Sequence, residues 1–227
     1  MANRRIPLWV KLVYTSFVGV VVPYYWVTYT PWNFLYFCDI ALLTTCLGMW
    51  LESPLLISMQ TIGITLPQML WVVDYLGELL FGVHVTGVAH YMFDARIPVF
   101  VRGLSSFHGW LPFVLLWLLT RVGYDRRALR AQLAVVVAVL LVSFYLVPAP
   151  PIPAAHPSWA VNINYVYGFD DMHAQTKMAP LAWLTMLGGI AFAMVVLTHY
   201  LFAWIYREPR QVAVPADAPT SDEVRKN

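Results

Sequence analysis

Residues 180–206 read PLAWLTMLGGIAFAMVVLTHYLFAWIY and contain no Asp, Glu, Lys or Arg. A helix needs roughly 20 apolar residues to cross the hydrocarbon core of a bilayer, so this run is typical of a transmembrane helix. Similar apolar runs recur from residue 7 onward. The sequence therefore predicts an all-α, polytopic membrane protein, a bundle of six transmembrane helices at about 7–29, 34–51, 55–76, 104–122, 129–147 and 180–206.

The composition of the whole chain agrees with a lipid environment. Of its 227 residues, 60% are hydrophobic and 11% are charged, whereas a soluble domain carries about a quarter charged residues. We expect one membrane domain over residues 1–206 and a polar cytoplasmic tail over residues 207–227. The net charge of +2 is small and implies no nucleic-acid partner.

The distribution of Lys and Arg predicts the orientation, because short cytoplasmic loops are enriched in these residues. With a cytoplasmic N-terminus, the outer side holds only Arg96, Arg102 and Lys177. We therefore expect an integral protein of the bacterial cytoplasmic membrane, with both termini inside. The cytoplasmic side then holds the larger set, Arg4, Arg5, Arg121, Arg126, Arg127, Arg130, Arg207, Arg210, Arg225 and Lys226.

Polar side chains from four segments converge on the outer face in this topology. Polar groups at membrane depth are costly and usually face a cavity or a partner, so we take this face as the candidate site. The start of the second helix, the end of the third, the start of the fourth and the loop before the sixth supply Asn33, Cys38, Asp39, Asp74, Glu78, Ser105, Ser106, His108, Asn162, Asn164, Asp170, Asp171 and His173.

Cys38 and His108 are the candidate nucleophile and base. A buried cysteine is ordinarily a small hydrophobe, and a histidine at a helix start commonly hydrogen-bonds a neighbouring helix. The functional interpretation joins them, because a thiol beside a histidine can become a nucleophile. The neighbours of Cys38 on its own helix are apolar, so the base must come from another helix. Asp39 either pairs with an Arg or caps a backbone group near the interface, or it orients a base or holds a proton.

A second group, His84, His90 and Asp94, has the spacing His-x5-His-x3-Asp. His90 and Asp94 would share one face of a helix, which makes metal binding conceivable. The spacing matches no strong zinc signature, so an ordinary loop is the favoured interpretation. We expect no metal and no cofactor.

Three stretches carry a resemblance to a known family: WNFLYFCDI at 32–40, FHGWLP at 107–112 and NINY at 162–165. In order and spacing they resemble the YwaF-type bacterial membrane proteins, which are similar to the eukaryotic androgen-induced and androgen-dependent (ADTRP-like) membrane proteins. The resemblance implies an intramembrane lipid hydrolase or acyltransferase. Cys38 would then be the nucleophile, His108 the base, and Asn164 and Tyr165 a substrate or oxyanion contact. The threonine-type members carry Thr where this chain has Phe37-Cys38-Asp39.

Three functions remain open from the sequence. The first is the lipid acyl-ester hydrolase or acyltransferase, whose partners are membrane lipids. The second is a non-catalytic integral membrane subunit or binding protein that docks on other membrane protein subunits. The third is a small transporter, in which Asp39 and Asp74 handle protons or substrate. Six helices without repeats or paired broken helices argue against the transporter.

Overall fold

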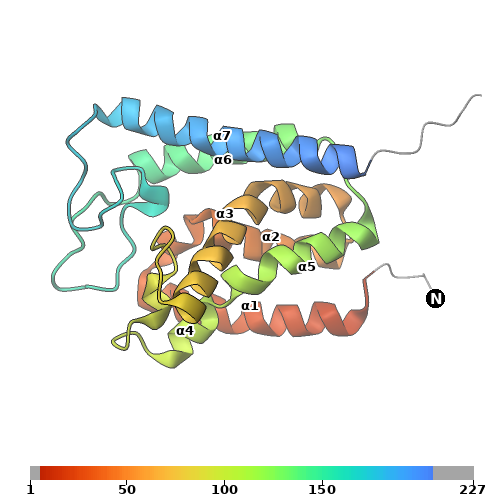
Figure 1. Ribbon diagram of the computed structural model, residues 1–227, viewed down its shortest axis with the longest axis horizontal. Helices are drawn as coiled ribbons and strands as arrows, with labels where there is room; N and C mark the ends of the chain where they lie inside the picture. Colours follow the sequence, from red (N-terminus) through yellow and green to blue (C-terminus); the bar gives the residue numbers. More distant parts are fainter. Residues whose placement is uncertain (1–5, 207–227) are drawn as a thin grey trace, which may run out of the picture.

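The fold consists of helices joined by loops, as seen in a computed structural model that describes residues 6–206. The predicted cytoplasmic tail, 207–227, lies outside the described residues. Within them there are helices and no strands, so the all-α prediction is confirmed (Figure 1). The α-helices are α1 (Leu8–Tyr29), α2 (Phe37–Leu51), α3 (Pro54–Phe81), α4 (Val99–Ser105), α5 (Phe107–Val122), α6 (Ala128–Tyr145) and α7 (Pro180–Ile205), and the 3₁₀ helices are η1 (Pro31–Leu35), η2 (His90–Phe93) and η3 (Ile163–Tyr165).

Five helical segments are long and apolar enough to cross a membrane: α1, α3, α4 with α5, α6 and α7. The predicted second span, 34–51, is the exception. Its first residues form η1, so α2 has only 15 residues, about 22 Å of helix against a hydrocarbon core of about 30 Å. The start of α2 and the chain leading into it therefore lie within the depth of the bundle.

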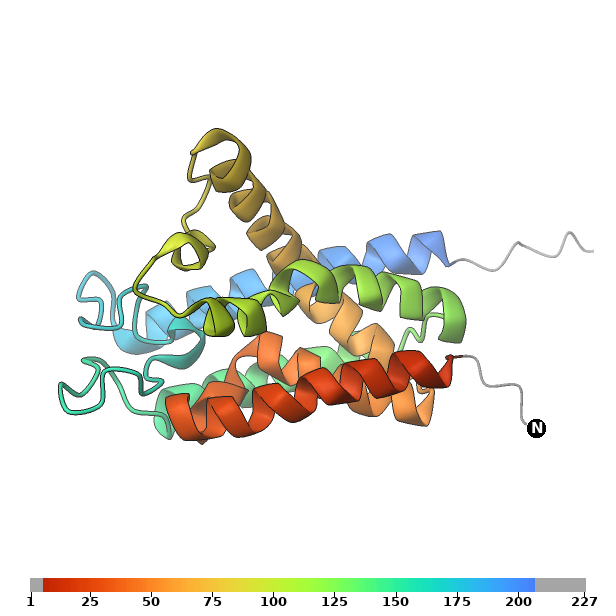
Figure 2. The same cartoon turned by 90° about the horizontal axis from the view of Figure 1, so that it is seen from below.

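Residues 77–103, between the predicted third and fourth spans, are divided between three elements. α3 continues past the predicted end at 76 to Phe81, where Gly82 adopts a left-handed conformation with φ +66° and ends the helix. A loop with η2 follows, and α4 begins before the predicted position 104. In Figure 2 the end of α3 leans away from the other helices, so this part of the chain projects from the bundle.

α3 is the central helix, because it packs against α2, α5, α6 and α7. The start of α1 and the end of α7 lie at the same end of the bundle (Figures 1 and 2). Figure 1 places η1, α4 and the long loop between α6 and α7 at the opposite end. Three of the four segments predicted to share the outer face therefore lie at one end, while the fourth, the end of α3, projects from the bundle.

Gly63 allows the closest approach between α3 and α6. A Cβ atom at this position would lie 2.4 Å from Nε2 and 2.9 Å from Cδ of Gln132. The Gln132 side chain is itself buried, with 2% exposure, so it has little room to move away. A side chain at position 63 would push the two helices apart.

We therefore expect Gly63→Ala to lower the free energy of unfolding by about 1–3 kcal/mol, the usual cost of overpacking a core. Gly19→Ala is the matched control, since a Cβ atom there meets nothing within 4 Å, and it should leave stability unchanged or raise it slightly. Thermal unfolding of both variants in detergent checks this expectation. Equal midpoints for the two variants would contradict it.

Candidate functional site

The entry to α2 holds a buried carboxyl–amide pair. Asn33 Nδ2 donates a hydrogen bond of 3.0 Å to Asp39 Oδ2, and both residues are buried, with 8% and 3% exposure. The other carboxyl oxygen, Oδ1, is buried without a hydrogen-bond partner. The partner of Asp39 is thus the Asn33 side-chain amide, in place of the Arg or backbone group expected for a structural role, and one oxygen remains available to a further donor.

Asn164 joins the loop between α6 and α7 to the entry of α2 by hydrogen bonds. Its Oδ1 accepts a hydrogen bond from the Phe37 amide at 3.2 Å, and its Nδ2 donates to the Leu35 carbonyl at 2.8 Å and to Ser143 Oγ at 3.4 Å. Asn164 itself has φ +57°, a left-handed conformation that asparagine tolerates better than most residues. The Asn164 side-chain amide therefore fixes the backbone of the residues immediately before Cys38.

Cys38, in the first turn of α2, is half-buried and packs against the hydrophobic core. Tyr91 of η2 and Tyr165 of η3 lie close to it. Burial raises the pKa of Tyr91, and the neighbouring Cys38 adds to the shift. Burial also raises the pKa of Tyr165, again with a contribution from Cys38. The thiol thus has tyrosines from two loops, distant in sequence, in its electrostatic surroundings.

His108, in the first turn of α5, has a defined tautomer. Its Nδ1 lies 2.8 Å from the Ser105 carbonyl oxygen, which can only accept, so Nδ1 carries the proton and Nε2 keeps its lone pair. The ring stacks on Trp71 of α3, with centroids 5.6 Å apart. Within the described residues no hydrogen bond joins His108 to Cys38, and the bond of the imidazole goes to Ser105.

Shared neighbours nevertheless connect the Asp39 and His108 regions. The Tyr25 hydroxyl of α1 lies near Asp39 and is 3.4 Å from Ser105 Oγ. The same Ser105 accepts from His108 through its carbonyl, and the hydroxyl of Tyr91 lies beside Ser105, Trp71 and Cys38. We call Cys38, Asp39, Tyr91, Ser105 and His108 the Cys38 cluster.

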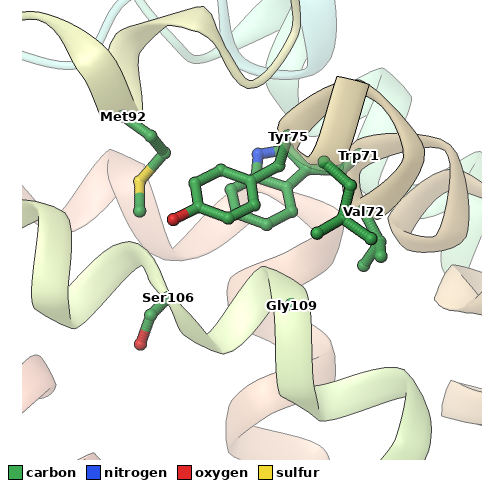
Figure 3. A pocket seen from close by; sticks show the side chains of 7 residues that line it. Trp71, Val72, Tyr75, Met92, Ser106 and Gly109 are labelled. Carbon is green, nitrogen blue, oxygen red and sulfur yellow. The ribbon is translucent and has the colours of Figure 1, made fainter. Parts of the chain in front are cut away.

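A column of stacked rings and a cavity border this cluster. Trp71 stacks on His108 and, on its other side, on Tyr75 at 5.3 Å, and Tyr75 stacks on Phe93 at 5.2 Å. Trp71 Nε1 is buried without a hydrogen-bond partner. The two stacked rings, together with Met92, form one wall of a cavity of about 250 Å³ (Figure 3), which is lined by Trp71, Val72, Tyr75, Leu76, Met92, Ser106 and Gly109.

Asp74 serves the loop after α3 instead of the Cys38 cluster. Its fully buried carboxylate accepts four backbone hydrogen bonds. Oδ1 takes those of Val85, Thr86 and Gly87 at 2.6–3.0 Å, and Oδ2 takes that of Ala89 at 2.8 Å. Four N–H donors on one carboxylate strongly favour its charged form, so Asp74 fixes the course of the chain between α3 and η2.

Two members of the site were missed by sequence reasoning. Tyr91 lies in a segment of mixed composition without periodicity, and Trp71 is one of many apolar residues of its helix. A weak signal existed for Trp71, because an indole N–H inside a membrane helix needs a partner. No comparable signal identified Tyr91.

No family model, curated protein or solved structure matches this chain. The resemblance to YwaF-type proteins therefore rests on the three sequence motifs and stays a prediction. The position of two of these motifs in the structure is compatible with a joint role, since Asn164 of the third motif bonds to Leu35 and Phe37 of the first.

Asp74→Asn should release the loop after α3. The substitution places an amide N–H₂ where a carboxylate oxygen now accepts, and a buried unpaired donor costs about 1–3 kcal/mol. We expect faster amide hydrogen exchange over residues 85–89, measured by mass spectrometry in detergent. Asp94→Asn is the control, because the Asp94 carboxylate is bound to the exposed Arg96 side chain. Unchanged exchange in Asp74→Asn would refute this role.

Proposed function

We propose that this chain is an intramembrane enzyme that cleaves or transfers the fatty-acyl ester of a membrane lipid, with Cys38 as the nucleophile. The observation that carries the proposal is the Cys38 cluster itself: a thiol and a carboxyl group at the start of α2 and an imidazole at the start of α5 share Tyr25, Tyr91 and Ser105 as neighbours inside an apolar bundle. Polar groups at such depth are rare unless they serve a function. We place the reaction at the outer leaflet of a bacterial cytoplasmic membrane, following the Lys and Arg distribution.

The proposed first step is attack by the Cys38 sulfur on the ester carbonyl carbon. His108 Nε2 takes the thiol proton, since Nδ1 is engaged with Ser105. A carbon–sulfur bond forms, the ester carbon–oxygen bond breaks, and the leaving alcohol receives the proton from His108. Water or the hydroxyl of a second lipid then attacks the thioester and regenerates the thiol. The outcome is hydrolysis in the first case and acyl transfer in the second.

Two buried polar atoms without partners support this assignment. The oxyanion that forms during attack needs a donor, and the Trp71 Nε1–H group, stacked beside His108, is one, because it lies near the Tyr91 hydroxyl without making a well-formed hydrogen bond to it. Asp39 Oδ1 is free to accept a hydrogen bond from the substrate or from a tyrosine hydroxyl. Asn164, by contrast, supports the site by holding the α2 entry, because its donors are already used.

An apolar groove between two helices suits an acyl chain. It has a volume of about 470 Å³ and runs between α1 and α5, beginning at Trp110, two residues after His108. Trp110 meets Tyr14 and Phe17 edge-on at 5.7 and 5.1 Å. The lining carries no charged side chain and consists of Trp9, Val10, Val13, Tyr14, Phe17, Trp110, Val114 and Trp117.

A non-catalytic membrane subunit is the second candidate, and one observation favours it. The projecting end of α3 and the following loop expose large apolar side chains, among them Phe81 at 78% and Leu80 at 64%. Such a patch is typical of a surface that binds a partner or lipid. Under this function the Cys38 cluster would only stabilise the packing of α2 against α5.

The test is turnover of phospholipids with labelled acyl chains by the purified protein in vesicles. Cys38→Ala and His108→Ala should each lower the rate by about 100-fold or more, since a positioned base alone contributes 10²–10⁴-fold. Cys46→Ala is the matched control, because Cys46 lies on the same helix but contacts Thr15, and it should retain full activity.

Mass spectrometry of the intact protein should also detect an acyl thioester in the wild type and none in Cys38→Ala. If Cys38→Ala turns over lipid at the wild-type rate, the nucleophile is wrong. If the wild type processes no acyl lipid while copurifying with a membrane protein in constant ratio, the subunit function replaces the enzyme.

A further inference from the structure

Three potential metal ligands meet at the projecting end of α3. Glu78 Oε2 lies 3.1 Å from His84 Nδ1, and Glu78 Oε1 lies 2.8 Å from His90 Nδ1. The two imidazole rings meet edge-to-face with centroids 4.7 Å apart. One ligand atom from each residue lies within 4.8 Å of the others. The sequence spacing had suggested Asp94 as the carboxylate of this group.

Asp94 is excluded as the carboxylate ligand, because it is already paired with Arg96. Its carboxylate is bound by the Arg96 guanidinium at 2.7–3.1 Å, and this interaction lowers the pKa of Asp94 to about 2. The carboxylate that faces both histidines is Glu78, one turn before the end of α3. Its side chain is 11% exposed, whereas those of His84 and His90 are 51% and 60% exposed.

The chain around this group is held independently of the three side chains. Gly82 and Val83 donate to the Glu78 and Gly77 carbonyls and turn the chain back on α3. The Asp74 carboxylate then binds four backbone amides between Val85 and Ala89. His84 and His90 flank that bound stretch, so the backbone brings both rings to the same carboxylate.

We propose that Glu78, His84 and His90 bind a divalent transition-metal ion, of which Zn²⁺ suits the donors best. Two imidazoles and one carboxylate, with a fourth position left to water, are a common Zn²⁺ ligand set. Zn–N and Zn–O bonds of about 2.0–2.1 Å place tetrahedral ligand atoms about 3.3 Å apart. The two Glu78–histidine distances are near this value but involve different carboxylate oxygens, so rotation of the carboxylate and of the exposed rings has to bring one oxygen and both Nδ1 atoms, now within 4.8 Å of one another, around the ion.

Binding would require both imidazoles to present an unprotonated Nδ1 to the ion, with the ring proton on the solvent-exposed Nε2. The ion would clamp the loop to α3 at its two ends, His84 and His90. Tyr91 follows His90 directly and lies beside Cys38. The proposal stands apart from the acyl chemistry, because the ion site can be measured without any turnover.

The experiment is titration of the tag-free, metal-stripped full chain in detergent with Zn²⁺, followed by calorimetry with a competing chelator. One ion should bind per chain. His84→Ala, His90→Ala and Glu78→Gln should each weaken binding by about 100-fold or more, at or above the upper end of the loss seen when a supporting residue is removed. Co²⁺ in place of Zn²⁺ should give visible absorption bands of a four-coordinate site, and each variant should abolish them.

His173→Ala is the matched control, because His173 forms an exposed pair with Asp170 at 3.0 Å but belongs to no group of three potential metal ligands within residues 6–206. It should bind Zn²⁺ like the wild type. Thermal unfolding without metal shows whether each variant is folded, and Glu78→Gln keeps hydrogen-bonding capacity where an alanine could unfold the loop. Failure of the wild type to bind one Zn²⁺, or equal affinity in all variants, would overturn the proposal.

Discussion

The structure depends on how the backbone is satisfied at the entry to α2. Backbone N–H and C=O groups inside a membrane need protein partners, because lipid offers none. α2 is too short to span the hydrocarbon core, so η1 and the first turn of α2 expose such groups within the bundle. Asn164 reaches across from the loop before α7 and binds both the Leu35 carbonyl and the Phe37 amide. The loop therefore closes the end of the bundle, and Cys38 lies directly beneath it.

Asp74 satisfies backbone groups with a side chain in the same way, in the loop after α3. One buried carboxylate replaces the partners that the amides of Val85, Thr86, Gly87 and Ala89 would find in a regular helix. In both places a single polar side chain determines the course of a loop, and in both the loop delivers a tyrosine to Cys38: Tyr165 from the first and Tyr91 from the second. The chemistry of the cluster thus depends on two residues that do not take part in it.

The sequence predicted an all-helical chain with long apolar helices, because apolar length is a property of the chain itself. The sequence did not predict which of the polar side chains are in contact with one another. Glu78 and Asp94 are both acidic residues near His90, and only the turn at Gly82 decides that Glu78 faces the histidine. Asn164 was expected to contact substrate. Its side-chain amide instead forms hydrogen bonds with backbone groups that have no helical partner, because α2 is short. Such contacts depend on tertiary geometry that no local pattern encodes.

The unpartnered atoms of the site argue for a ligand more strongly than its polar residues do. A protein can bury Asn33 and Asp39 as a pair with little net cost when each hydrogen bond is made. Leaving Asp39 Oδ1 and Trp71 Nε1 without partners costs the desolvation of each group. Tyr91 lies beside Trp71 and Cys38, at the end of the chain segment that Glu78 and the histidines fasten. A contact that restrains His90 therefore also restrains Tyr91, which follows it and lies near the Cys38 thiol. The loop after α3 and the Cys38 cluster are thus mechanically coupled.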